Sequence, residues 1–488
     1  MVNQRNLSMI VIAAAVACML FSVWDGAARA NDHYEIEGPF DTPMEVTEMC
    51  LECHEDAASE VMATSHWTWK RLQEIPGKGQ VVRGKTNVIN NFCVSIGANW
   101  ARCTSCHVGY GWVDESFDFS DETRVDCLVC HDTTGNYVKP GAGAGYPAGF
   151  TNNAMMDENP VDLEEIAQNA GMPTRENCIV CHAFGGGGNN VKAGDMSNAM
   201  KNPARGLDVH MDTKGLNFTC QQCHASDTPH DIPGNSLIVS AGGETTMSCS
   251  DCHGESPHRY FPTAEQYNNH TERIACQTCH ISHFAKADGT KMSWDWSKAV
   301  DPKTLPEDKR VITKDGHKVF IAQKGEFVYE HDAVPAYRWY NGTAGAYTIG
   351  DEIDPNGVTL LNYPLGSRDD SEAKIMPFKI HTGKQIYDST YNYLITPKVW
   401  GEKGDPEAYW TTFDWDKAAA AGMKVSGLEY SGEYGFARTE TYWPINHQVD
   451  PKEKALKCLD CHKSGKRLDW VALGYDGDPM RSKRLPDN

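Results

Sequence analysis

Beyond its first thirty residues the sequence has no long apolar run, and nowhere does it have a block of basic side chains. Basic residues are also outnumbered, because 45 Lys and Arg stand against 66 Asp and Glu, for a formal net charge of −21. Since nucleic acids are bound through clustered Lys and Arg, nucleic acid is not expected among the partners. The glycine-rich stretch at 139–149 follows no strand and opens no clear helix, which argues against a dinucleotide-binding loop.

The first thirty residues have the layout of a cleaved secretory signal. Arg5 precedes an apolar run from about Met9 to Val23, and small residues stand at Ala28 and Ala30. This run is shorter than the roughly 20 apolar residues that a membrane span needs. We therefore expect cleavage after Ala30 and a periplasmic mature protein without a membrane span. An uncleaved anchor is the alternative.

Almost every cysteine belongs to one repeated motif. Of the 18 cysteines, Cys18 lies in the signal, sixteen form eight Cys-x-x-Cys pairs that are each followed directly by histidine, and Cys93 alone remains. This motif attaches c-type haem, because its two thiols form thioethers to one porphyrin and its histidine binds the iron. Zinc sites and redox dithiols do not require that histidine every time, and a disulfide scaffold predicts irregular spacings.

We therefore expect eight covalently bound c-type haems, each with its iron. The attaching cysteines are Cys50, Cys53, Cys103, Cys106, Cys127, Cys130, Cys178, Cys181, Cys220, Cys223, Cys249, Cys252, Cys276, Cys279, Cys458 and Cys461. The motif histidines, expected as iron ligands, are His54, His107, His131, His182, His224, His253, His280 and His462.

Eight haems in a chain of this length would make up much of its core. We therefore expect a multihaem cytochrome c fold, with mainly short α-helices and irregular loops wrapped around the haems and a minor β component in the C-terminal lobe. The motifs have no fixed period, which excludes a solenoid of identical units. Strand-like pieces punctuated by turns occur at 317–332 and 333–351.

The positions of the motifs divide the chain. Residues 1–30 are the signal peptide, and 31–285 form a region with seven haems. Residues 286–488 form a mixed lobe that folds back onto this region and carries the eighth haem, because the gap before the last motif is too long for a connector. We expect 450–462 to be a helix that delivers the last haem.

The histidines outside the motifs decide whether each iron is closed on its second side. His33, His317 and His331 have the terminal or charged contexts of solvated surface residues, and His283 follows a motif histidine so closely that it is the least favoured candidate. Seven others lie near a motif or beside apolar residues, and we expect them to be distal iron ligands: His66, His210, His230, His258, His270, His381 and His447. Seven candidates for eight haems leave one haem without a distal histidine.

Several stretches, some of them outside the haem motifs, resemble the periplasmic octahaem tetrathionate reductase family. The resemblance covers most of the mature chain. It is carried by NNFCVSIGANWARCTSCHVGYGW (90–112), VDCLVCHDTTGNY (125–137), CIVCHAFGGGGNNVKAGDMSNAM (178–200), DVHM (208–211), PAYRWYNGT (335–343), KIHTGKQIYD (379–388) and INHQVDPKEKALKCLDCH (445–462). It implies seven haems with two histidine ligands each and an active-site haem, second in sequence, with a lysine ligand and a cysteine nearby.

Carried over to this sequence, the resemblance places the active-site haem at Cys103 and Cys106, within 31–285. It makes Cys93 and Lys192 the catalytic residues and Lys192 the iron ligand, and a family acid near the lysine would correspond to Asn189 or Asp195. The chemistry is compatible, because burial beside a metal favours the neutral amine of a lysine whose ordinary pKa is about 10.4. A surface Lys192 and a buried, inert Cys93 are the alternatives.

The activity implied by the resemblance is reduction of tetrathionate to thiosulfate, and also of nitrite and hydroxylamine, with electrons from a periplasmic or membrane-bound cytochrome. A thiolate at Cys93 could attack the disulfide-like central bond of tetrathionate. Because the chain is acidic, attraction of such an anion must be local, and Arg102, Lys192 and Arg205 are candidates for it. Two other functions stay open, a non-catalytic electron carrier with every iron closed and a hydroxylamine-oxidising enzyme.

Overall fold

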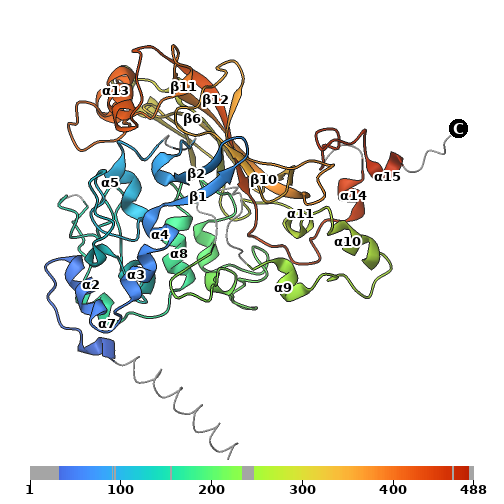
Figure 1. Cartoon of the computed structure of the whole chain (residues 1–488), viewed down its shortest axis with the longest axis horizontal. Coiled ribbons are helices and arrows are strands. Elements are labelled where there is room, and N and C mark those ends of the chain that lie inside the picture. Colours follow the sequence, from blue (N-terminus) through green and yellow to red (C-terminus); the bar gives the residue numbers. More distant parts are fainter. Residues whose placement is uncertain are drawn as a thin grey trace, which may run out of the picture.

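The computed structural model describes most of the chain, in two parts that pack against each other (Figure 1). The first holds seven motifs and is built of short helices, and the second is a lobe built on a large sheet. The expected signal peptide and Cys93 both lie outside the described residues. Across the described ranges, no helix has the length and apolar character to cross a membrane. The described residues are 32–90, 92, 95–153, 156–233, 247–463 and 467–482.

The helices of the motif region are short, and several begin at a capping side chain that accepts a backbone N–H, such as Thr42, Asp162 and Thr174. Most motifs lie in or beside a helical turn, where the spacing of three residues puts both thiols on one face. The helices are α2 (Pro43–Leu51), α3 (Ala57–Met62), α4 (Ser65–Thr68), α5 (Trp100–Cys103), α6 (Leu128–His131), α7 (Leu163–Gln168), α8 (Arg175–His182), α9 (Cys249–His253), α10 (Ala264–His270) and α11 (Cys276–His280).

A ten-stranded mixed sheet forms the lobe, with the strand order β4-β5-β6-β3-β10-β12-β9-β8 and with β7 and β11 also paired to β10. Long β10 and β12 are antiparallel neighbours from Phe378↔Pro444 to Asp388↔Tyr434. The strands are β3 (Thr290–Asp295), β4 (Val311–Lys314), β5 (His317–Ile321), β6 (Gly325–Glu330), β7 (Ala336–Tyr340), β8 (Ala344–Ala346), β9 (Val358–Pro364), β10 (Lys374–Asp388), β11 (Tyr393–Leu394) and β12 (Tyr434–Pro444).

This sheet corrects the expectation of a minor β component. The two strand-like pieces do form β5 to β8, but they join a much larger sheet. The parallel pairs β3 with β10 and β9 with β12 connect segments far apart in the sequence, and short-range patterns do not reveal such pairings. A further hairpin, β1 (Lys70–Ile75) and β2 (Gly79–Gly84), lies in the motif region, where no strand was expected.

Helix α13 (Trp415–Val425) packs on the sheet lobe through an aromatic core. The rings of Tyr409, in α12 (Tyr409–Thr412), and Trp415 stack with 3.7 Å between centroids. The last motif lies in α14 (Cys458–Cys461), followed by α15 (Pro479–Ser482). The helix expected at 450–462 is therefore a single turn. Residues before it are held by other bonds, since the Asp450 carboxylate accepts from the Ser282 backbone N–H.

One buried amide joins the motif region to the sheet lobe. Asn99 lies directly before α5, and its Nδ2 donates to the Pro397 carbonyl oxygen over 3.1 Å. Its Oδ1 accepts the backbone N–H groups of Val399 and Trp400, both over 2.9 Å. The segment that carries Cys103 is thus held against residues 397–400 of the lobe.

Candidate functional site

Seven of the eight motif histidines each face another histidine at nearly the same distance. The ring centroids lie 6.0 to 6.3 Å apart in these pairs. Two metal–nitrogen bonds of about 2 Å, extended by the half-width of each ring, span this distance. Each pair can therefore hold one metal between its rings. The pairs are His33–His54, His66–His182, His131–His230, His210–His253, His224–His447, His258–His280 and His270–His462.

A cavity of about 4090 Å³ runs between these histidines. An ordinary ligand pocket has roughly 300–1,000 Å³, so this space suits several large groups. Most of the motif cysteines line it, from Cys50 at one end of the motif region to Cys279 at the other. The paired imidazoles, the lining thiols and the volume together fit covalently attached haems.

Two histidines lie differently from expectation. His33, expected at the surface, belongs to a 3-10 turn at Asp32–Glu35 and faces His54 with 6.2 Å between centroids. His381, expected as a distal ligand, is fully buried in β10, where its ring packs on Phe92 at 4.4 Å. Within the described part of the chain, His381 makes no ring contact with a motif histidine. Its apolar neighbours reflect burial inside the sheet lobe, and His33 takes its place in the set of pairs.

The other three histidines outside the motifs lie away from these pairs. His283 Nδ1 hydrogen-bonds the neighbouring Ser282 Oγ over 3.1 Å. His317 and His331 share a hydrogen bond of 2.7 Å between their Nε2 atoms, at the edge of the sheet lobe.

The second motif departs from this pattern. In three other motifs, those of His131, His224 and His462, the bonded ring nitrogen is Nδ1, as in His131, which contacts the Gly171 carbonyl oxygen over 2.8 Å, so Nε2 stays available for a metal. His107 is reversed, because its Nε2 lies 2.7 Å from the Trp67 carbonyl oxygen and donates to it. Burial lowers the pKa of His107 to about 3, so the ring is neutral. In this arrangement His107 Nε2 is bonded to the protein, and the expected bond from His107 to iron stays a prediction.

Aromatic rings hold His107 in that position. The ring is fully buried, and its centroid lies 4.7 to 5.5 Å from those of Trp67, Trp69, Trp112 and Phe117. Lys139 Nζ also donates to the His107 carbonyl oxygen over 2.6 Å while pairing with Asp126. The Cys103–Cys106 motif therefore keeps its two thiols at the cavity and turns its histidine away.

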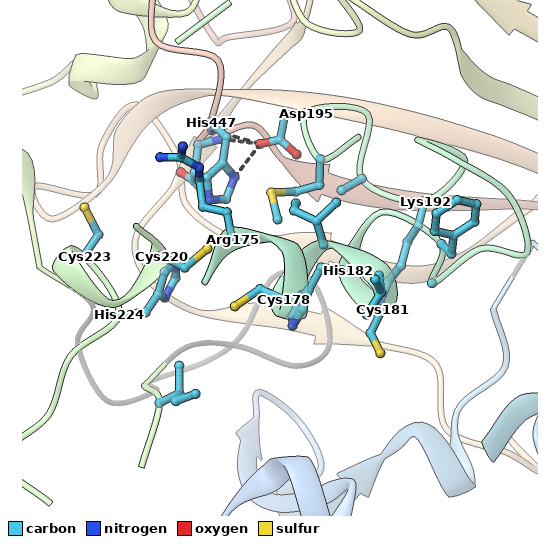
Figure 2. A pocket seen from close by; sticks show the side chains of 18 of the residues that line it. Arg175, Cys178, Cys181, His182, Lys192, Asp195, Cys220, Cys223, His224 and His447 are labelled. Carbon is cyan, nitrogen blue, oxygen red and sulfur yellow. Dashed lines mark hydrogen bonds and ion pairs between the residues drawn. The ribbon is translucent and has the colours of Figure 1, made fainter. Parts of the chain in front are cut away.

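Lys192 lies on the cavity wall close to these thiols. Its Nζ is 4.8 Å from the ring centroid of Trp443, and Figure 2 shows its side chain running toward the Cys181 end of α8. Burial, reinforced by the charge of Lys85, lowers the pKa of Lys192 to about 7, while Cys106 opposes the shift. Gly185 makes room for the chain, since a Cβ there would lie 3.0 Å from Lys192 Cδ. The structure thus presents an amine that is about half neutral at pH 7, near the motif that has turned its histidine away.

Neither residue expected as the family acid contacts Lys192 through its side chain. The buried Asp195 carboxylate accepts from His447 Nδ1 over 3.1 Å and from the backbone N–H of Asn446 over 2.9 Å (Figure 2). Burial raises the pKa of Asp195, but these hydrogen bonds and the charge of His447 together hold it below the ordinary value. Burial lowers the pKa of His447, but the bond to Asp195 and its negative charge raise it above the ordinary value. Asn189 accepts from the Asn198 backbone N–H over 2.8 Å. Asp195 therefore orients a histidine that faces His224.

Comparisons with known proteins show to which family the chain belongs. A family model described as "Cytochrome c bacterial" matches residues 291–465. An uncharacterized protein of Archaeoglobus fulgidus is 26% identical over 238 residues, which cover 40% of this chain and 78% of that protein. The crystal structure of octaheme cytochrome c from Shewanella oneidensis is 49% identical, has a TM-score of 0.84, and the match covers 94% of this chain and 100% of that one. With its repeated attachment motifs and paired imidazoles, this chain is a redox protein with covalently bound c-type haem and belongs to the octahaem c-type cytochromes.

Proposed function

We propose that the protein is a periplasmic reductase of small sulfur or nitrogen oxyanions that carries eight haems. Seven would lie between the histidine pairs and relay electrons from an external periplasmic or membrane-bound cytochrome. The eighth, attached at Cys103 and Cys106, would be the catalytic haem, with Lys192 as its iron ligand. The observation that carries this proposal is the asymmetry between seven paired histidines and the turned-away His107.

Lys192 suits the role of iron ligand because its lowered pKa leaves about half of the amine neutral at pH 7. When bound there, the haem would supply electrons and an open coordination position for a substrate. Aromatic residues pack beside Lys192. Phe92 and Trp443 pack together with 5.6 Å between their ring centroids. Lys192 Nζ lies 4.8 Å from the ring centroid of Trp443.

Cys93 is the one cysteine after the expected signal that stands outside the attachment motifs, and the resemblance of the sequence around it supports it as the nucleophile. In tetrathionate reduction the Cys93 thiolate would attack one central sulfur, form a Cys–S–S–SO₃⁻ adduct and release one thiosulfate. Two electrons would then break the new S–S bond, release the second thiosulfate and restore the thiolate. Both steps balance in charge without a proton.

The test is steady-state turnover of the purified protein with reduced viologen dye, with tetrathionate, nitrite and hydroxylamine compared side by side. Cys93→Ala should abolish tetrathionate turnover and keep nitrite turnover, because only the S–S bond needs a thiol. Cys93→Ser is the matched control for size and should behave like the alanine variant. Tetrathionate turnover at the wild-type rate in either variant would reject the nucleophile role.

A non-catalytic electron carrier is the second candidate, and the seven histidine pairs favour it because a pair closes both sides of an iron. The two functions differ at the second motif. Binding of cyanide or nitrite to one haem of the wild-type protein, seen as a change in its absorption spectrum, is expected for the reductase. A spectrum unchanged by both ligands would favour the carrier.

A further inference from the structure

In the described structure, the segment that carries Lys192 lies in neither a helix nor a strand. Residues 189–195 form turns and bends between α8 and the 3-10 turn at Asn198–Lys201. Asn190 in this segment is fully buried, and Val191 is almost fully buried. Buried carbonyl groups need hydrogen-bond donors, and a segment of turns has no neighbouring strand to supply them. The donors that these carbonyl groups receive from other parts of the chain therefore decide where Lys192 lies.

Two side chains of the sheet lobe donate to three successive carbonyl groups of this segment. Thr290 Oγ1, at the start of β3, donates to the Asn190 carbonyl oxygen over 2.6 Å. Lys379 Nζ, in β10, donates to the carbonyl oxygens of Val191 and Lys192, each over 2.8 Å. Lys379 Nζ also donates to Thr290 Oγ1 over 2.6 Å, because the proton of that hydroxyl is already directed to Asn190. All three N–H groups of the Lys379 ammonium are thus used.

The burial of Lys379 shows what these bonds contribute. The side chain is fully buried, and a buried ammonium is costly unless its N–H groups are paired. Burial lowers the pKa of Lys379, whereas the charge of Asp195 raises it. The three acceptors also favour the ammonium, because a neutral amine has only two N–H groups. An apolar side chain could fill the same place in β10, so the ammonium adds its bonds to the segment of Lys192.

The same two strands also meet the amine end of Lys192. Lys379 in β10 lies directly opposite Trp443 in β12, and opposite residues of an antiparallel pair point to the same face of the sheet. Trp443 is the ring whose centroid lies 4.8 Å from Lys192 Nζ. Gly194, with φ +93°, lets the chain turn closely against this face, since a Cβ there would lie 3.1 Å from Lys379 Cδ. One cross-strand pair therefore contacts both the backbone and the amine of Lys192.

We propose that Lys379, together with Thr290, positions Lys192 and so sets the coordination of the catalytic haem from the sheet lobe. Lys379 is a positioning residue, because Lys192 and Trp443 line the cavity whereas Lys379 and Thr290 are not among the described residues that do. This inference rests on the proposed function and deepens it by naming what places the iron ligand. The physical reason is that a ligand already held in place has little conformational freedom left to lose when it binds.

The main variant is Lys379→Met, which keeps the length of the side chain and removes every donor. The spin states of the haems are read by EPR in the oxidised protein, at a pH above the pKa of Lys192, so that a lost ligand reports its position and not its protonation. We expect a high-spin signal from one haem, while the haems between the histidine pairs stay low-spin. A low-spin spectrum in the folded variant would overturn the inference.

Hydrogen–deuterium exchange follows the segment itself in the same variant. In the wild type, the Asn190 backbone N–H donates to the Ala183 carbonyl oxygen over 3.0 Å, which protects it from exchange. We expect exchange in the peptide that contains residues 189–195 to become about tenfold faster in Lys379→Met, because bonds to a charged donor are lost. Unchanged exchange, or high-spin signals from several haems, would also overturn the inference, since neither result is a local release of Lys192.

Thr290 offers a second test with a matched control, which decides the question should Lys379→Met not fold. Thr290→Val keeps the shape of the side chain and removes its hydroxyl group, so the Asn190 carbonyl loses its donor and Lys379 loses one acceptor. Thr290→Ser keeps the hydroxyl group. We expect a partial high-spin signal from one haem in Thr290→Val and a wild-type spectrum in Thr290→Ser. Identical spectra for the two variants would contradict the role of the hydroxyl group in placing Lys192.

The spectra need no turnover, so the inference and the proposed function can fail separately. If the wild type reduces none of the three substrates, the proposed function fails. The positioning of Lys192 still stands in that case if Lys379→Met turns one haem high-spin. If the wild type reduces tetrathionate while Lys379→Met keeps a low-spin spectrum, the proposed function stands and the role of Lys379 falls.

Discussion

Lys192 provides the sharpest prediction, because the same amine must lose its proton in order to bind iron. Its pKa falls from 10.5 to about 7. An ordinary lysine is neutral in roughly one molecule of 3,000 at pH 7, whereas this one is neutral in about half, a difference of about 5 kcal/mol in the free energy of protonation. Because Lys192 borders the cavity, this is an upper value.

The direction of the pH dependence follows from this shift. The amine is neutral above its pKa and protonated below it, so ligation is favoured as pH rises and lost as pH falls. Iron competes with the proton for the same lone pair, so the midpoint in the haem-loaded protein should lie below about 7. We expect a high-spin EPR signal from one haem to grow on acidification, and a signal that grows with rising pH would refute the reasoning.

Two variants complete the test of this prediction. Lys192→Leu should show the high-spin signal at every pH, and an all-low-spin spectrum would reject Lys192 as the ligand. Lys85→Leu is the control, since Lys85 Nζ lies 4.0 Å from the Trp69 ring and leucine can keep that contact. Because the charge of Lys85 lowers the pKa of Lys192, its removal should move the acid transition to higher pH while leaving the haem low-spin in alkaline solution.

Three further predictions concern the surrounding framework. Replacing His33 by alanine should open one more iron and add a high-spin EPR signal, and an unchanged spectrum would contradict its place opposite a motif histidine. Asp195→Asn should raise the reduction potential of the haem that His447 binds, because a carboxylate acceptor makes an imidazole a stronger donor to iron; spectroelectrochemistry would show a constant or lower potential if this is wrong. Asp126→Asn should cost about 3–5 kcal/mol in the free energy of unfolding, because it leaves the buried Lys139 charge uncompensated at a 2.6 Å contact; a loss of less than about 1 kcal/mol in a denaturant titration would contradict this.

The attachment chemistry was predictable because it is local. A thiol spacing of three residues and the adjoining histidine lie within one helical turn, so the motifs alone indicate the cofactor. The second histidine of each pair is harder to predict from the sequence. His224 and His447, for example, are far apart along the chain and come together only in the folded protein. His33 was missed for the same reason. Its short polar segment gives no sign that it packs beside His54.

His107 shows how the surroundings of a motif can orient its histidine. Its five-residue motif is identical in form to the other seven, and only its surroundings turn the imidazole toward Trp67. The available signal was the density of aromatic residues in HWTW (66–69) and in the segment from Trp112 to Phe119. The large sheet was underestimated for a related reason, since its parallel pairs connect strands separated by long stretches of chain.

The bonds made by Asn99 have a consequence for biogenesis. They hold residues 397–400 of the sheet lobe against the segment that carries Cys103, so we expect the thiols of Cys103 and Cys106 to be most accessible to the maturation machinery before the lobe docks. We therefore expect the thioether bonds at Cys103 and Cys106 to form before the lobe docks. A secreted chain that ends at residue 285 should still acquire haem at Cys103 and Cys106, as peptide mass spectrometry would show, whereas a lobe that docks early would trap the two thiols unmodified.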